Sequence, residues 1–299
     1  MKWFSVILIA FICLILSCRK EYSLQKFNIG TSASDISYSE KTFLVSNHAD
    51  LLLKTPTGAK LHFPAYAFVN KLGQTVADNI TIEVKEILKP DAMILHNILS
   101  VSGNELLESG GEFYVGVKSG SEKLKLAPGV YMKMSLPNIG VNVSGMQVFN
   151  GKVDTTTGNF NWQLNTNPGN LVAADSTGNS NFDSYSLFSY ELEWINCDRF
   201  INEPKFDLTV YPGNTPNVDS TDGYIQLPGR NSAMFLMNNG ITLYGRVIAG
   251  PVAIIGICRS NGVLKASIQK INIGSVQSST MNFVTMSEAE LKQKLKVLR

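Results

Sequence analysis

The fold class is decided by the stretch Val130-Tyr131-Met132-Lys133-Met134-Ser135-Leu136. Apolar residues fill its first, third, fifth and seventh positions, and more polar residues fill the positions between them. A period of two places one set of side chains on each face of a β-strand, so this stretch is predicted to be a strand with one buried face. The two methionines on that face are expected to fill the core and not to bind a ligand.

Other stretches of the chain also show patterns that are typical of β-strands. Residues Ile80–Lys85 alternate between β-branched and more polar side chains, which indicates a half-buried strand. Residues Val252–Ile257 form a continuous apolar run, which predicts a central strand buried on both faces. The 299 residues include 24 glycines, and short apolar runs stand between turn-forming residues. We therefore predict an all-β protein with two β-sandwich-like domains.

One short helix is expected at the C-terminus. Ser287 with Glu290 three residues later forms the pattern of a capping box. Leu291, Leu295 and Leu298 follow at the spacing of one helix face. This face is narrow, so the helix is expected to dock on the second domain and not on a membrane.

The N-terminus carries the pattern of an export signal. Lys2 precedes an apolar run from Trp3 to Leu16, and the run ends at Ser17-Cys18. The run is shorter than the roughly 20 apolar residues of a membrane-spanning helix. The order of basic tip, apolar core and small residue predicts a secretory signal that is cleaved between Ser17 and Cys18. A plain cleaved signal and an uncleaved anchor are the alternatives.

The ending of this segment resembles the lipobox of bacterial lipoproteins. The resemblance implies that Cys18 is lipidated and ties the mature chain to a membrane, where two or more acyl chains give stable anchoring. Arg19 follows the cysteine in place of the aspartate that retains many lipoproteins at the inner membrane. The implied address is therefore the outer membrane of the cell envelope, and its periplasmic and surface faces both stay open.

Changes in composition divide the chain into five segments. Residues from Asn165 to Ser186 are rich in Asn, Gly, Ser, Thr and Asp, which is typical of a linker or a long surface loop. The predicted segments are a signal peptide (1–17), a flexible tether (18–40), a first β-sandwich domain (41–165), a linker or long loop (166–186) and a second β domain with the C-terminal helix (187–299).

The first domain opens with a second resemblance. Gly58, Leu61, Phe63-Pro64, Ala67-Phe68 and Ile80–Val84 are spaced as in the opening of a ZU5-type β-sandwich module. This resemblance implies a binding or force-bearing module and not an enzyme. Some ZU5-type modules cleave themselves at a histidine, an apolar residue and a serine, whereas His62-Phe63 is followed here by Pro64.

Four cysteines fit an exported protein. Cys13 leaves with the signal and Cys18 takes the lipid, which leaves Cys197 and Cys258. An oxidising envelope allows these two to pair as a disulfide. The alternative is two separate buried thiols, because free cysteine packs as a small apolar residue.

One short cluster is the candidate structural or binding site. Trp194, Asp198 and Arg199 stand close together in the sequence. As a functional site, they would form a charged group beside an aromatic wall. As a structural element, Trp194 would pack with Phe200 while the charged residues satisfy nearby backbone groups.

Bulk composition limits the chemistry. The formal net charge is +2 and 17% of the residues are charged, which does not suggest a nucleic-acid partner. Three histidines leave little material for histidine-based metal or acid–base sites. We therefore predict no cofactor, no metal site and no catalytic residues.

The predicted function is that of a lipid-anchored cell-envelope protein that acts as a non-catalytic binding or structural module. Its expected partners are the membrane, through Cys18, and an envelope protein or glycan. The alternatives are an envelope glycan hydrolase or a carbohydrate-binding protein. A hydrolase would use an acid pair such as Glu83 with Glu86 or Glu108 with Glu112, and carbohydrate binding without hydrolysis would use an exposed Trp162 or Tyr211.

Overall fold

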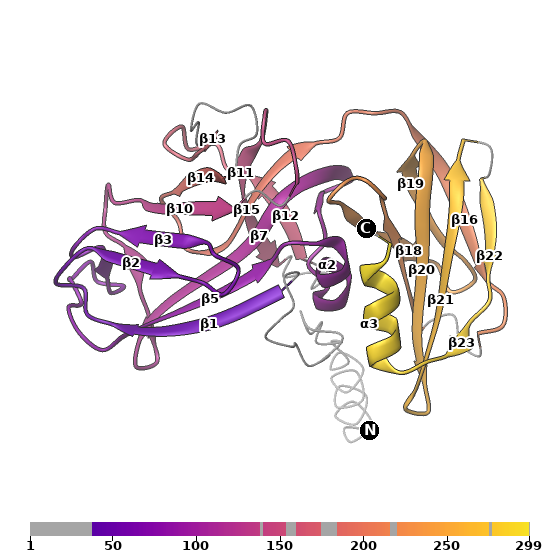
Figure 1. Ribbon diagram of the computed structural model, residues 1–299, viewed down its shortest axis with the longest axis horizontal. Helices are drawn as coiled ribbons and strands as arrows, with labels where there is room; N and C mark the ends of the chain where they lie inside the picture. The colour runs from indigo at the N-terminus through magenta and orange to yellow at the C-terminus, as the bar shows by residue number, and fades with distance from the viewer. Residues whose placement is uncertain are drawn as a thin grey trace, which may run out of the picture.

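The computed structural model describes residues 38–137, 140–153, 160–174, 184–215, 220–274 and 277–298 (Figure 1). The predicted signal peptide with Ser17, the predicted lipidation site Cys18 and the predicted tether up to residue 37 lie outside these residues. Strands make up about 58% of the structure and helices about 7%, which confirms the all-β fold. None of the helices in the described ranges combines the length and apolar character needed to cross a membrane.

Two sheets form the first sandwich. The large sheet has the order β1 (Tyr38–Val45), β5 (Ile80–Ile87), β7 (Glu105–Ser119), β15 (Glu193–Phe200), β11 (Gln147–Val153) and β12 (Phe160–Leu164), and β6 (Val101–Ser102) and β8 (Glu122–Lys123) pair with β7. The facing sheet has the order β13 (Leu171–Ala174), β14 (Ser184–Ser189), β10 (Met132–Pro137), β3 (Lys60–Phe63) and β2 (Leu51–Lys54). A two-stranded ladder joins β4 (Phe68–Val69) to β9 (Lys125–Leu126).

The core of this sandwich forms from alternating residues of both sheets. Met132 and Met134 on β10 are fully buried and Leu136 is nearly so, which confirms the alternation expected for this strand. They join Phe113 of β7 and Ile195 of β15 in one apolar cluster. The opposite face of the large sheet therefore carries the residues at the positions between.

Two strands lie elsewhere than the sequence suggested. Residues 187–299 were expected to form the second domain, but β14 pairs with β10 of the facing sheet and β15 pairs with β7 and β11 of the large sheet. Leu171–Ala174, in the expected linker, is strand β13 and pairs with β14. Composition locates a polar loop, but it carries no information about which strands pair across that loop.

A third sheet follows. Its order is β22 (Ser278–Met281), β16 (Lys205–Pro212), β19 (Leu243–Ile248), β18 (Ala233–Asn238), β17 (Thr221–Gln226), β20 (Gly250–Ser260), β21 (Val263–Ile273) and β23 (Val284–Thr285). Strand β18 changes partner along its length: Ala233–Leu236 pair with β17, and Met237–Asn238 pair with β19. Residues of β16, β19, β17 and β20 meet in one apolar cluster, so the third sheet encloses a core of its own.

Strand β20 confirms the prediction of a central strand buried on both faces. It lies between β17 and β21, and Val252–Ile255 are at most 1% exposed. Ile254 belongs to the core of the third sheet, whereas Ala253 and Ile255 face a different apolar cluster. That cluster joins the third sheet to two helices and to the outer face of the large sheet.

The helices α2 (Pro90–His96) and α3 (Glu288–Lys296) contact each other between the large sheet and the third sheet (Figure 1). Helix α3 confirms the expected C-terminal helix and has both hydrogen bonds of its capping box. Helix α2 was not expected from the sequence. Pro90 begins it, and Asn97 ends it in the left-handed conformation at φ 57°.

Candidate binding site

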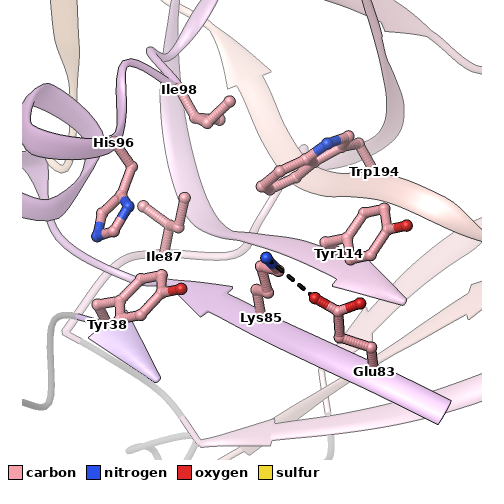
Figure 2. Close-up of a pocket in the computed structure, with 8 residues that line it drawn as sticks. All are labelled: Tyr38, Glu83, Lys85, Ile87, His96, Ile98, Tyr114 and Trp194. Carbon is pink, nitrogen blue, oxygen red and sulfur yellow. Dashed lines mark ion pairs between the residues drawn. The ribbon is translucent and has the colours of Figure 1, made fainter. Parts of the chain in front are cut away.

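A pocket of about 340 Å³ opens on the outer face of the large sheet, beside helix α2 (Figure 2). Aromatic, charged and apolar side chains line it together. They are Tyr38, Glu83, Lys85, Ile87, His96, Ile98, Tyr114 and Trp194.

Strand register brings the central residues of the pocket together. Glu83, Lys85 and Ile87 alternate along β5 with core residues, so they share the face that points away from the sandwich core. Lys85 is paired across the sheet with Tyr114 of β7, and Tyr114 is paired with Trp194 of β15. A row of cross-strand neighbours therefore forms the floor and one wall of the pocket.

Two aromatic pairs flank the pocket. The rings of Tyr114 and Trp194 have centroids 5.3 Å apart at an interplanar angle of 53°. On the other side, the Tyr38 ring stacks on His96 of α2, with centroids 4.0 Å apart and planes within 11° of parallel. Figure 2 shows the two pairs on opposite sides of Lys85. The pocket is thus flanked by aromatic rings on two sides.

An ion pair lies between these rings. The Lys85 Nζ is 3.0 Å from Glu83 Oε1 and 3.6 Å from Glu40 Oε1, and each of the three side chains is partly exposed. Partial burial acts to lower the pKa of Lys85, but the hydrogen bond to Glu83 and the charge of Glu40 outweigh it, so the pKa is raised. Lys85 therefore carries its charge at neutral pH and serves as a hydrogen-bond donor.

Two glycines leave space for the side chains of Tyr114 and Trp194. A Cβ at Gly116 would lie 2.7 Å from the Tyr114 hydroxyl oxygen, and one at Gly151 would lie 2.6 Å from the Cβ of Trp194. Neither Gly116 nor Gly151 has a positive φ, so backbone conformation does not require glycine at these positions. What these positions require is the absence of a side chain next to Tyr114 and Trp194.

A closed cluster of polar residues lies next to the pocket on the same sheet face. Glu112 precedes Tyr114 by two positions on β7 and is fully buried, and its carboxyl oxygens make no hydrogen bond to a described residue. Asp198 is also fully buried, and its Oδ2 accepts a 2.6 Å hydrogen bond from Asn196 Nδ2. Burial raises the pKa of both carboxyls well above their usual values, and ionisation of Asp198 would raise the pKa of Glu112 further. This cluster favours two neutral carboxyl groups with no access from solvent.

The three residues singled out in the sequence have different surroundings. Trp194 lines the pocket, whereas Asp198 lies in the closed cluster. Arg199 pairs with Glu108 at 2.8 Å and donates a 3.2 Å hydrogen bond to the Ser144 carbonyl. The three residues therefore do not form one charged site beside an aromatic wall.

The two cysteines do not form a disulfide in the structure. Cys197 and Cys258 are both free and buried. Cys197 lies in the core of the first sandwich and Cys258 lies in the core of the third sheet. Of the two alternatives, the structure has the separate buried thiols.

The side chains considered for glycan chemistry are not arranged for it. Glu83 lines the pocket, but Glu86 faces the other side of β5 and accepts hydrogen bonds from Thr55 and Thr57. Glu108 is held by Arg199, and Glu112 is enclosed.

The two aromatic residues suggested for carbohydrate binding do not form a shared exposed surface. Trp162 is fully buried, while Tyr211 is 48% exposed. Trp162 packs instead against Phe160, with ring centroids 4.9 Å apart.

Most of the pocket was not predicted. The sequence pattern singles out Trp194 but not Tyr38, His96, Lys85 or Tyr114 as site residues. The alternation around residues 80–87 places Glu83 and Lys85 on an outer face, which is the one signal in the sequence for their role. The cross-strand neighbours that complete the pocket depend on register, which alternation does not give.

No protein-family model matches this chain, and no curated protein matches it significantly. Among the described residues, no group of three or more His, Cys, Asp or Glu side chains could hold a metal ion.

Proposed function

We propose that this chain is a lipid-anchored protein of the cell envelope that binds a partner molecule without chemical catalysis, and that the aromatic pocket on the large sheet is its binding site. The observation that carries the proposal is the pocket itself. It combines two pairs of rings with one ion pair in a volume of about 340 Å³. This composition is typical of a ligand site, in which apolar walls supply contact area and a few polar groups fix orientation.

The lipobox resemblance at Cys18 and the ZU5-like opening support the remainder of the proposal. The first implies an anchor at the outer membrane, and the second implies a binding module.

Acyl labelling tests the anchor. Cells that express the full chain or Cys18→Ala are grown with a labelled fatty acid, and the protein is purified. We expect label in the wild type and none in Cys18→Ala. Equal label in both would refute lipidation at Cys18. External protease added to intact cells then distinguishes the surface from the periplasmic face.

Photocrosslinking tests the pocket without assuming a ligand. Azidophenylalanine is placed at position 114, in the pocket, and in a second variant at position 211, where the native tyrosine is 48% exposed on β16. After illumination of intact cells, we expect a covalent adduct at position 114 and not at position 211. The same adducts at both positions, or none at position 114, would refute the pocket as the binding site.

A further inference from the structure

The two ring pairs present apolar faces with polar edges. Tyrosine and tryptophan each combine a large apolar ring with one polar group. A sugar ring is built in a similar way, with C–H groups on its flat face and hydroxyls around its edge. A sugar stacked on Tyr114 or Trp194 would bury its C–H face while its hydroxyls point toward neighbouring polar groups.

The ion pair suits such hydroxyls. The Glu83 carboxylate accepts hydrogen bonds, and the Lys85 ammonium donates them. A hydroxyl both donates and accepts, so adjacent hydroxyls of one sugar can satisfy both partners. Both side chains are about 30% exposed, so an entering ligand can reach them while the rings exclude part of the water around them.

The charges at the pocket disfavour an anion, and the position of Lys85 disfavours a cation between the rings. Glu40, Glu83 and Lys85 together carry one net negative charge, which opposes an anion. The ammonium of Lys85 lies between the two ring pairs, 6.0 Å from the Tyr114 centroid, and it would repel a cation bound between the rings (Figure 2). A neutral, hydroxyl-rich molecule meets neither penalty.

Pocket size limits the ligand to a small unit. The volume of about 340 Å³ lies near the low end of the roughly 300–1,000 Å³ found for small-molecule sites. Buried Ile87 and Ile98 close its apolar side. The space fits a short saccharide segment.

We propose that the pocket binds a neutral saccharide unit, which stacks on Tyr114 and Trp194 while Glu83 and Lys85 hydrogen-bond to its hydroxyls. This inference rests on the proposed function, because it names the ligand class of the same site. Tyr114 and Trp194 contact the ligand, and Gly116 is a positioning residue because it lets the Tyr114 ring lie where it does.

Calorimetric titration tests the ligand class. The full chain is purified in a detergent without a sugar headgroup and titrated with neutral trisaccharides of glucose, galactose, mannose and N-acetylglucosamine. We expect saturable binding to at least one of them, weakened about tenfold or more in Tyr114→Ala and in Trp194→Ala. The control is Tyr131→Ala, because Tyr131 belongs to an exposed aromatic group on the facing sheet, 5.7 Å from Phe188.

A glycine variant separates binding from folding. Trp194 also packs against Phe160, so its removal can disturb the fold. In Gly116→Ala, the new Cβ displaces the far end of the Tyr114 side chain, which can move at little cost to stability. We expect severalfold weaker binding with an unchanged unfolding midpoint. Unchanged binding in this variant, with the midpoint also unchanged, would contradict the role of Tyr114 as a stacking platform.

Two results overturn the saccharide assignment. One is the absence of binding to every neutral trisaccharide in the panel. The other is binding that survives in Tyr114→Ala and Trp194→Ala. Neither result alters the crosslinking experiment at position 114, which reports on the pocket as a site for any ligand. Failure of the ligand class and failure of the proposed function are therefore distinguishable.

Discussion

Replacing Glu112 by glutamine is predicted to stabilise the protein at neutral pH. Glu112 is fully buried, and its two carboxyl oxygens make no hydrogen bond to a described residue. Ionising it would place a charge in the interior next to Asp198, so burial and that neighbour raise its pKa well above the usual value, and the nearby Trp162 and Ser100 side chains offset only part of this rise. Glutamine has nearly the same shape and no charge.

The sign of the change in the free energy of unfolding with pH follows from how many protons the folded and unfolded chains bind. In the unfolded chain a glutamic acid ionises near pH 4.3. Above that pH the folded chain still holds the proton and the unfolded chain does not, so the folded state binds more protons and the free energy of unfolding falls as pH rises. The stability associated with protonated Glu112 is complete below about pH 4.3 and is lost up to the raised folded pKa.

The size of this pH effect is set by the one proton that folded Glu112 keeps and the unfolded chain releases. Each pH unit inside this window lowers the free energy of unfolding of the wild type by about 1.4 kcal/mol relative to Glu112→Gln. Between pH 5 and pH 7 the difference between the two proteins therefore grows by about 2.7 kcal/mol in favour of the variant, while folded Glu112 stays protonated.

Urea denaturation at pH 5, 6 and 7, followed by tryptophan fluorescence, measures this difference. Glu191→Gln is the matched control, because Glu191 is an exposed acid in the turn before β15. Its difference from the wild type is expected to stay constant over the same range. If the difference between Glu112→Gln and the wild type were also constant with pH, or fell as pH rose, the buried carboxyl would not be neutral and the reasoning would fail.

Three further predictions concern the helix and the thiols. Leu295→Ala removes a fully buried side chain of α3 and is expected to lower the free energy of unfolding by about 2–5 kcal/mol, measured by urea denaturation against exposed Val297→Ala. Ser287→Ala removes the side chain that accepts a hydrogen bond from the Glu290 N–H, and a loss of about 1 kcal/mol is expected in the same assay; an unchanged midpoint would contradict the cap. Cys197 and Cys258 are expected to resist a thiol reagent in the folded chain and to react after unfolding, as judged by mass spectrometry of their peptides, because both are buried and burial raises the pKa of Cys197 well above its usual value. A Cys197–Cys258 disulfide-linked peptide would contradict the structure.

Local pattern was enough to predict the strands with one or two buried faces. β10 alternates between core and surface, and Val252–Ile257 of β20 form an apolar run because both faces of that strand are covered. The capping box likewise identified α3. In each case the information lies within a few neighbouring residues.

Pairing between distant strands was not predictable in this way. β15 is separated from β7 by more than 70 residues, yet the two strands are hydrogen-bonded neighbours. The Gly110-Gly111 pair lies where the register between β7 and β15 shifts. What the glycines could not show is the partner strand. The pocket depends on that partner, since Tyr114 meets Trp194 only through this register.

The position of the pocket follows from how much of the outer face of the large sheet is covered by the two helices and the third sheet. The outward-facing residues of β7 change in order from Glu112, which is fully buried, through half-buried Tyr114 and Gly116 to exposed Lys118. This covering layer is attached near the buried end of β7, where the Ser109 N–H donates a hydrogen bond to the Asn231 carbonyl. Helix α2 ends at His96, whose ring reaches the edge of the pocket. The pocket therefore lies where this covering layer ends. Polar side chains beneath the covering layer are inaccessible to solvent, while the next residues on the same face are partly accessible to a ligand.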